Sequence, residues 1–333
     1  MDLSILNKIS LPIFKRNPQG KPKLDLQEVF NLWSLLQTRY KNVEAIQIFR
    51  NFIHDRDLQA VVDQVMEEYQ RQMAQAENEV KSFAVKMMER PPVDVKTSQP
   101  VEALSDGFIF IRIYELVRND LFHLSRAMRT TTTNDRLRSI LRGFLTAQLD
   151  IFELLVKYGK VKEWLDIAPT FKTARAVKKE KLDVAEAYHL VDHLTLRYDQ
   201  IQLTQFFASF AHDPEYAAIL KAGLHTLEAQ VKRLEKIALE MEVPLPKRPP
   251  VSVKTPADPE TIEDVFTYRT IYRGIQEAVD LHLRAIVEST RNDSLRQLFS
   301  DFFAVELDIN DKLIKYGKAK GWPHQQPLYI SQT

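Results

Sequence analysis

Apolar residues recur with helical spacing in four successive segments of the N-terminal half of the chain. The first segment predicts a helix from about residue 26 to residue 53, and the second predicts a helix that runs to about residue 89. A third and a fourth follow. The predicted stripes are Val29, Leu32, Leu36, Tyr40, Val43 and Gln47; Leu58, Val62, Val65, Tyr69 and Met73; Phe108, Ile111, Glu115, Arg118 and Phe122; and Leu137, Leu141, Phe144, Gln148, Ile151 and Leu155.

The same pattern returns without a gap 158 residues later. The sequence "RPPVDVKT" at 90–97 recurs as "RPPVSVKT" at 248–255, and "KYGK" at 157–160 recurs at 315–318. The sequence therefore predicts a tandem duplication. We expect an N-terminal extension at 1–24, a first four-helix copy at 25–164, a basic linker at 165–182 and a second copy at 183–329.

Short motifs mark the predicted helix ends. Two Asp-x-x-Glu sequences, at 25–28 and 183–186, are spaced as capping boxes. Asp213 precedes a proline and is therefore expected to cap the next helix. The glycines of the two KYGK sequences, Gly159 and Gly317, stand where a helix C-terminus favours a left-handed residue.

The proline-rich segment between the second and third helices is long enough to cross a whole bundle. Eleven residues in an extended conformation, "RPPVDVKTSQP", reach roughly 34 to 36 Å. A 25-residue helix is about 37 Å long. The second and third helices can therefore run parallel, as in the ferritin-like arrangement. The predicted fold is all-α, with two tandem ferritin-like four-helix bundles that each have a long Pro-rich crossover between helices two and three.

These features together resemble one ferritin-like family of spore-forming bacteria. The resemblance rests on the tandem copies, on "RPPV" at each crossover and on the short "YGK…W" tail that closes each copy. The family is catalogued as a domain of unknown function, and its members are often labelled spore coat proteins. The resemblance covers residues 25 to about 329 and implies no catalytic residue, because the family has none assigned.

Composition excludes several kinds of chemistry and of partner. The 333 residues include no Cys, which removes disulfides, thiolate metal sites and Cys nucleophiles. The net charge is +1, with +4 on residues 1–24, +3 on 165–182, −1 on 25–164 and −5 on 183–322. Mildly acidic copies argue against a nucleic-acid-binding face. The N-terminus lacks the apolar run of a signal peptide and no stretch is apolar enough to span a membrane, so we expect a cytoplasmic protein, with spore association implied by the resemblance.

The metal ligands of a ferritin-like site are mostly missing. A di-iron centre needs Glu-x-x-His sequences on two helices, and the chain has one, Glu186 to His189, whose Glu is better explained as half of a capping box. His193, on the same helix face as His189, and Glu306, on the stripe of the last helix, are further candidates. A three-ligand site of His189, His193 and Glu235 is a second possibility. The leading prediction is that there is no metal site and no cofactor.

Charged residues on core stripes require partners, because a buried carboxylate must be paired, metal-bound or protonated. Glu306 corresponds to a Gln in the first copy, and Arg269 or Arg273 is expected to neutralise it. Arg39 and Arg197, beside the core tyrosines of the first helix in each copy, are expected to turn partly outward.

The sequence favours a non-enzymatic structural or protein-interaction protein with a protein partner or self-association, linked to sporulation by resemblance alone. The alternative is a divergent metal-binding or oxidase-like ferritin-like protein. A third interpretation is a bundle that holds a hydrophobic small molecule. The apolar N-terminal extension is expected to pack on its own chain, the alternative being an arm that orders on a partner.

Overall fold

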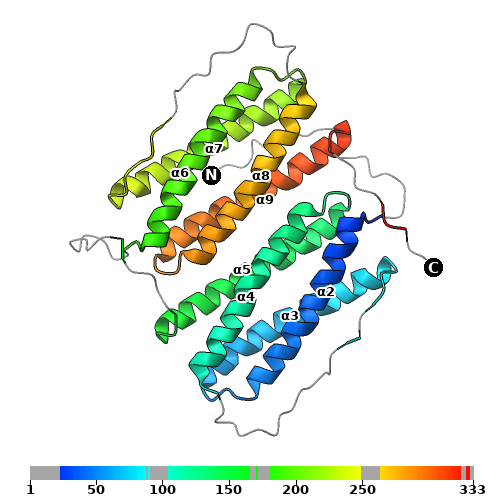
Figure 1. Ribbon diagram of the computed structural model, residues 1–333, viewed down its shortest axis with the longest axis vertical. Coiled ribbons are helices and arrows are strands. Elements are labelled where there is room, and N and C mark those ends of the chain that lie inside the picture. The colour runs from blue at the N-terminus through cyan, green and yellow to red at the C-terminus, as the bar shows by residue number, and fades with distance from the viewer. Residues whose placement is uncertain are drawn as a thin grey trace. The chain divides into compact units, whose positions relative to one another are not determined.

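The computed structural model describes residues 23–87, 89–90, 104–165, 170–171, 181–248, 263–323 and 328–330. Within these residues the regular structure is eight helices with two isolated β-bridges, which confirms the all-α class (Figure 1). The chain forms two compact units. The N-terminal extension and nearly all of both proline-rich segments lie outside the described residues.

Each unit holds four long helices. The first bundle contains α2 (Leu26–Arg50), α3 (Arg56–Ser82), α4 (Asp106–Thr130) and α5 (Asp135–Val161). The second bundle contains α6 (Val184–Ala208), α7 (Pro214–Glu240), α8 (Asp264–Glu288) and α9 (Asp293–Lys320). Every helix of the second bundle begins 158 positions after its counterpart, so residue n of the first bundle corresponds to residue n + 158 of the second.

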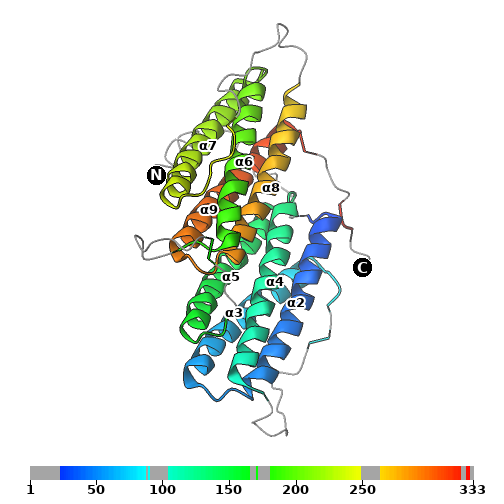
Figure 2. The same ribbon diagram turned by 60° about the vertical axis from the view of Figure 1, so that its left-hand side comes forward.

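Hydrogen bonds between helices fix the helix directions within a bundle. Consecutive helices α2 and α3, and α4 and α5, form antiparallel hairpins (Figures 1 and 2). The start of α3 contacts the start of α4, because the backbone N–H of Asp55 donates to the Asp106 carboxylate at 3.1 Å. In the middle of both helices, the Tyr69 hydroxyl lies 3.2 Å from the Asp120 carboxylate. The helices α3 and α4 therefore run in the same direction, and α7 and α8 do so through the Asp213–Asp264 contact.

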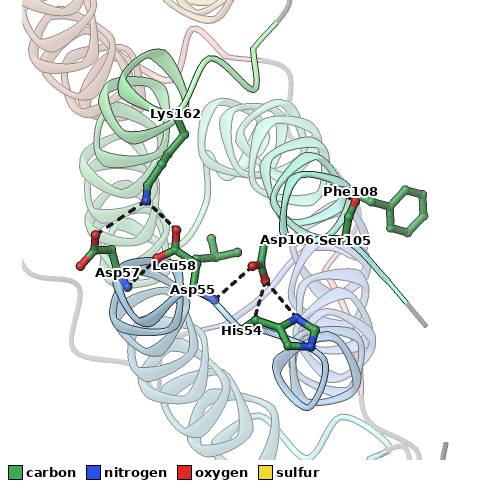
Figure 3. Close-up of polar contacts among 8 residues, drawn as sticks. All are labelled: His54, Asp55, Asp57, Leu58, Ser105, Asp106, Phe108 and Lys162. Carbon is green, nitrogen blue, oxygen red and sulfur yellow. Dashed lines mark hydrogen bonds and ion pairs between the residues drawn. The ribbon is translucent and has the colours of Figure 1, made fainter. Parts of the chain in front are cut away.

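One polar cluster joins three helix ends in each bundle, and Figure 3 shows the cluster of the first bundle. Asp106 accepts hydrogen bonds from the backbone N–H groups of His54 and Asp55. Lys162 follows the end of α5, and its Nζ atom lies 2.5 Å from Asp55 Oδ2. The second bundle repeats the cluster with His212, Asp213, Asp264 and Lys320. The cluster satisfies N–H groups that would otherwise lack partners at the start of α3 and α7, so we interpret it as structural.

The predicted capping boxes are confirmed. The Asp25 side chain accepts from the Glu28 backbone, and the Glu28 side chain accepts from the Asp25 backbone at 3.1 Å. Glu28 also accepts from the backbone N–H groups of Thr133 and Asn134, both at 2.7 Å. Each box thus ties the start of the first helix to the loop between the third and fourth helices, 105 positions later.

Two predicted helix ends were wrong. The first helix ends at Arg50 rather than near residue 53, and the second ends at Ser82 rather than near residue 89. Ala84 follows in a left-handed conformation with φ of 52°, and the N–H of Val85 reaches back to the carbonyl of Val80. This is a Schellman-type end made without the glycine that usually announces it.

The roles predicted for Gly159 and Gly317 were also wrong. Both lie inside helices, and the left-handed residues at these helix ends are Glu163 and Gly321. A Cβ atom on Gly159 would come within 2.5 Å of the Phe110 ring. A Cβ atom on Gly317 would collide with the Tyr268 ring in the same way. These glycines permit close packing of an aromatic ring against the last turns of the bundle.

The buried face of α4 differs from the predicted stripe. Phe108 and Phe122 are exposed, and Glu115 forms an ion pair with Arg112 near the surface. The true core positions lie about one residue further round the helix. They are Ile109, Phe110, Ile113, Tyr114, Val117, Asp120, Leu121 and Leu124. None of the described helices combines the length and the apolar character that a membrane crossing requires.

A short extended segment precedes the first helix of each bundle and pairs with a second segment. The N–H of Tyr329 donates to the carbonyl of Leu24 at 2.7 Å, and the N–H of Phe171 donates to the carbonyl of Leu182 at 2.8 Å. The described residues 328–330 therefore group with the first bundle in the compact unit that contains it.

Candidate functional site

A fully buried arginine lies in the middle of each bundle. Arg39 and Arg197 both have 0% of their surface exposed, so the expectation that they turn partly outward was wrong. A buried guanidinium is stable only with a carboxylate and further hydrogen-bond acceptors around it. The groups that surround each arginine form the strongest candidate site of each bundle.

In the first bundle the arginine is balanced by a carboxylate on α4. Arg39 Nη1 lies 2.5 Å from Asp120 Oδ2, and Arg39 Nε donates to Gln72 Oε1 at 2.9 Å. The guanidinium stacks on Tyr69, with 4.8 Å between Arg39 Cζ and the ring centroid. The Tyr69 hydroxyl donates to Asp120 and accepts from the side-chain amide of Gln148. One connected network thus neutralises and encloses the charge.

In the second bundle the carboxylate comes from a different helix. The position that corresponds to Asp120 is Ala278, and the position that corresponds to Gln148 is Glu306, on α9. Arg197 Nη2 lies 3.0 Å from Glu306 Oε2. Arg269 and Arg273 do not fill this role as predicted: Arg269 donates to the Trp322 carbonyl, and Arg273 is exposed.

Two histidines extend the network of the second bundle. Arg197 Nη2 contacts His282 Nε2, which as the partner of a guanidinium must be an acceptor. His282 Nδ1 therefore carries the proton and donates to His193 Nε2 at 3.0 Å. His193 Nδ1 in turn donates to the carbonyl of His189 at 2.7 Å. One arrangement of protons, with both rings neutral, satisfies all four ring nitrogens.

Burial and charge both favour that neutral state. Burial lowers the pKa of His193 well below its usual value, and the neighbouring His282 and Arg197 lower it further. Burial likewise lowers the pKa of His282, assisted by Arg197. Burial raises the pKa of the Glu306 carboxyl, and Arg197 opposes that rise. The charged pair of the cluster is Arg197 with Glu306, whose side chains lie 3.0 Å apart.

The third histidine of this helix belongs to a separate contact. His189 Nε2 lies 2.8 Å from the carboxylate of Glu288, whose side chain is half exposed, near the end of α8. His189 and His193 share a helix face, but their ring centroids are 6.4 Å apart and each ring bonds to a different partner. They do not form a common ligand pair.

The residues proposed as metal ligands do not converge. Glu186 accepts from the backbone N–H groups of Asp183, Arg291 and Asn292, so its carboxylate is used at a helix cap. Glu235 accepts from the Tyr198 hydroxyl at 2.7 Å and does not bond to His189 or His193. Within the described part of the chain, no three His, Asp or Glu side chains are arranged to hold a metal ion.

The donor set around Glu306 also does not suit a cation. Glu306 lies 3.5 Å from His282 Nε2, whereas His193 faces the other ring nitrogen, Nδ1. Glu306 and His193 therefore lie on opposite sides of the His282 ring and do not face one common position. The guanidinium of Arg197 stands between them and would repel a metal ion.

Arg197 and His282 are the members of the cluster that sequence reasoning missed. A signal for Arg197 was present, because an arginine stands three residues after a core leucine at the same position in both copies. The exchange of Asp120 and Gln148 for Ala278 and Glu306 is a second signal, because one carboxylate disappears where another appears.

Comparisons with known proteins support the family resemblance over the second half of the chain. Residues 170–333 match the family described as "Protein of unknown function (DUF3231)". A solved structure from Bacillus halodurans C-125, named "putative spore coat protein", is 26% identical to this chain, with a TM-score of 0.43. The match covers 47% of this chain and 99% of that chain. No curated protein matches the sequence.

Proposed function

We propose that this chain is a non-enzymatic structural protein that acts through protein–protein contacts. The observation that carries the proposal is a set of large apolar side chains that stay exposed at matching positions of both bundles. On the first helix these are Phe30 and Tyr188, with 57% and 58% of their surfaces exposed. On the third helix they are Phe108 and Phe266, with 45% and 59% exposed.

Single exposed apolar residues are common and need no explanation. The repetition is what favours contact with a partner, because the two bundles differ at many core positions and yet keep aromatic side chains in water at the same places. Leu26 and Val184, one turn before Phe30 and Tyr188, follow the same rule. Aromatic residues are also enriched at protein interfaces.

The buried polar clusters support the non-enzymatic part of the proposal. Each central arginine is balanced by one carboxylate, and the titratable groups of the second cluster are engaged with each other. The resemblance to proteins of spore-forming bacteria supports a role in sporulation. The metal-binding alternative is not proposed, because the ligands it needs do not converge.

The test is site-specific photocrosslinking in sporulating cells of the source organism. A photoreactive phenylalanine analogue at Tyr188 or Phe30 should give a discrete crosslinked product, either with a second copy of the chain or with one other protein. The matched control is Leu239, which is 63% exposed but corresponds to Lys81 in the first bundle. Equal crosslinking from Leu239 and Tyr188, or none from either aromatic position, would contradict the proposal.

A further inference from the structure

The middle of the second bundle contains less side-chain volume than the middle of the first. Three large residues that are at most 1% exposed in the first bundle are replaced by smaller ones in the second. The first-bundle residues and their counterparts are Val65 and Gly223, Tyr69 and Leu227, and Phe152 and Asn310.

Beside Gly223 the lost volume is not refilled by neighbouring side chains. A Cβ atom on Gly223 would meet no other atom within 4 Å, although the corresponding Val65 is completely buried. The helix α7 also approaches α8 and α9 less closely than α3 approaches α4 and α5. A cluster of buried aromatic and leucine side chains fills the bundle near the start of α7 and the end of α9. It includes Leu220 and Leu313. The space therefore begins within one turn of that cluster.

Near this level of the bundle, apolar side chains on all four helices are partly open to solvent, and those of Ile271 and Ile275 also pack against the aromatic cluster. Their first-bundle counterparts are each at most 7% exposed. The partly exposed residues are Ile201, Leu224, Leu227, Ile271, Ile275 and Ile309. Partly open apolar side chains on four helices, at the level where Gly223 has open space beside it, suit a small-molecule site between the helices of a bundle.

Two buried polar atoms lack partners on Arg197 and on Gln230, and Gln230 lies about two turns along α7 from Gly223. In the first bundle Arg39 Nε donates to Gln72 Oε1. The corresponding atoms of the second bundle, Arg197 Nε and Gln230 Oε1, are both buried and make no hydrogen bond. One is a donor and the other an acceptor, so a single hydroxyl group can satisfy both, accepting from Arg197 and donating to Gln230.

The charge balance at this level favours an uncharged ligand. Arg197 is neutralised by Glu306, and burial keeps His193 and His282 neutral. A carboxylate or an ammonium group would therefore enter without a counter-charge and lose its hydration.

We propose that the middle of the second bundle binds a small, neutral, mainly apolar molecule that carries one hydroxyl group. The apolar body lies against the α7 surface at Gly223 and Leu227, and the hydroxyl lies between Arg197 and Gln230. The first bundle has no such site, because Val65 and Tyr69 fill it. This inference is independent of the proposed structural function.

The test uses 4-ethylphenol and ethylbenzene, which have the same body and differ in the hydroxyl group. Binding of each to the full chain is measured by ligand-observed NMR titration at neutral pH. We expect one 4-ethylphenol per chain, bound at least tenfold more tightly than ethylbenzene. If 4-ethylphenol does not bind, water fills the space and the proposal is overturned.

A substitution that restores the residue of the first bundle locates the site. Gly223→Val should weaken 4-ethylphenol binding at least tenfold without lowering the melting temperature. The matched control is Gly143→Ala, because Gly143 also has open space around it but lies on the exposed surface of the first bundle. Unchanged binding by Gly223→Val, or equal losses in both variants, would place the ligand elsewhere and overturn the proposal.

The hydroxyl contact has its own variant. Gln230→Leu removes the unpartnered acceptor, so it should bring the affinity for 4-ethylphenol down to that for ethylbenzene and leave ethylbenzene binding intact. If the preference for 4-ethylphenol survives in Gln230→Leu, the hydroxyl does not lie between Arg197 and Gln230, and the proposed ligand class is wrong.

Discussion

The two bundles solve one electrostatic problem in different ways. Each buries an arginine at the same position of its first helix, and each balances that charge with one carboxylate. In the first bundle the carboxylate is Asp120 on the third helix, and in the second it is Glu306 on the fourth. The carboxylate can therefore move between helices, provided that it still reaches the guanidinium.

The parts that did not change between the copies are those at the bundle ends. The capping boxes and the polar cluster of Figure 3 recur with the same partners. The parts that did change lie in the middle. The ends thus define the frame, and the middle is free to vary in volume and polarity.

The largest effect is expected from removal of the carboxylate beside Arg39. Asp120→Ala leaves a buried, unbalanced guanidinium and should lower the stability of the first bundle by about 3 to 5 kcal/mol. The added change Gln148→Glu transfers the arrangement of the second bundle to the first. It should recover at least half of the loss. The measurement is urea unfolding followed by circular dichroism.

The reciprocal single variant is the control for this exchange. Gln148→Glu alone adds a second carboxylate beside Arg39, whose charge Asp120 already balances. This single variant should therefore be less stable than the unchanged chain. If Gln148→Glu fails to rescue Asp120→Ala, the two bundles do not share an interchangeable charge site.

The next effect is a difference in acid sensitivity. His193 and His282 have pKa values lowered by burial, so they take up protons more readily when unfolded. Because only the unfolded chain protonates these histidines, the free energy of unfolding falls as the pH drops below 6.5. Each histidine that stays neutral when folded costs at most about 1.4 kcal/mol per pH unit in that range. Because the unfolded histidines are only half protonated at pH 6.5, each costs about 1 kcal/mol between pH 6.5 and pH 5.5, and the second bundle should lose up to about 2 kcal/mol.

The first bundle has Leu35 and Leu124 at these positions and supplies the control. The double variant His193→Leu and His282→Leu should remove most of the pH dependence between pH 6.5 and pH 5.5, measured by urea unfolding at both values. An equally steep dependence in the double variant would assign it to other groups.

A smaller effect is expected where both bundles pack a ring against a helix. Gly159→Ala places a methyl group against Phe110, and overpacking of this kind costs about 1 to 3 kcal/mol. Gly143→Ala, on an exposed face of the same helix, should instead stabilise by up to about 1 kcal/mol through helix propensity. Thermal unfolding of the two variants gives the comparison, and equal melting temperatures would show that Phe110 moves aside freely.

The smallest effect is expected from filling the second bundle. Gly223→Val adds apolar surface where no atom lies within 4 Å and replaces a poor helix former, so it should stabilise by about 1 kcal/mol. Val65→Gly, the reverse change in the first bundle, should destabilise by more, because it opens a cavity in a packed core. Loss of stability in Gly223→Val would mean that the space is smaller than the structure indicates.

The bundle frame could be predicted from the sequence because its signals are local. The capping boxes at 25–28 and 183–186 and the proline after Asp213 fix helix starts within a few residues, and the structure has them there. The end of α3 could not be predicted, since Ala84 adopts a left-handed conformation that sequence normally assigns to glycine.

The central clusters were harder to predict because their partners are distant in sequence. Arg197 was expected to turn outward, as arginines usually do, and the groups that make its burial possible lie 85 and 109 positions away. The predicted core positions of α4 were about one residue off, because Phe108 and Phe122 are apolar and yet exposed. Periodicity alone assumes that large apolar residues face the core.

The most direct test of the difference between the two bundles is a crystal structure of the full chain soaked with 4-ethylphenol. We expect the ligand beside Gly223 in the second bundle, with its hydroxyl in hydrogen-bond contact with Arg197 and Gln230. We also expect Val65 and Tyr69 to close the corresponding place in the first bundle. A second bundle in which Leu224 and Leu227 pack against α9 and leave no room would contradict the first expectation.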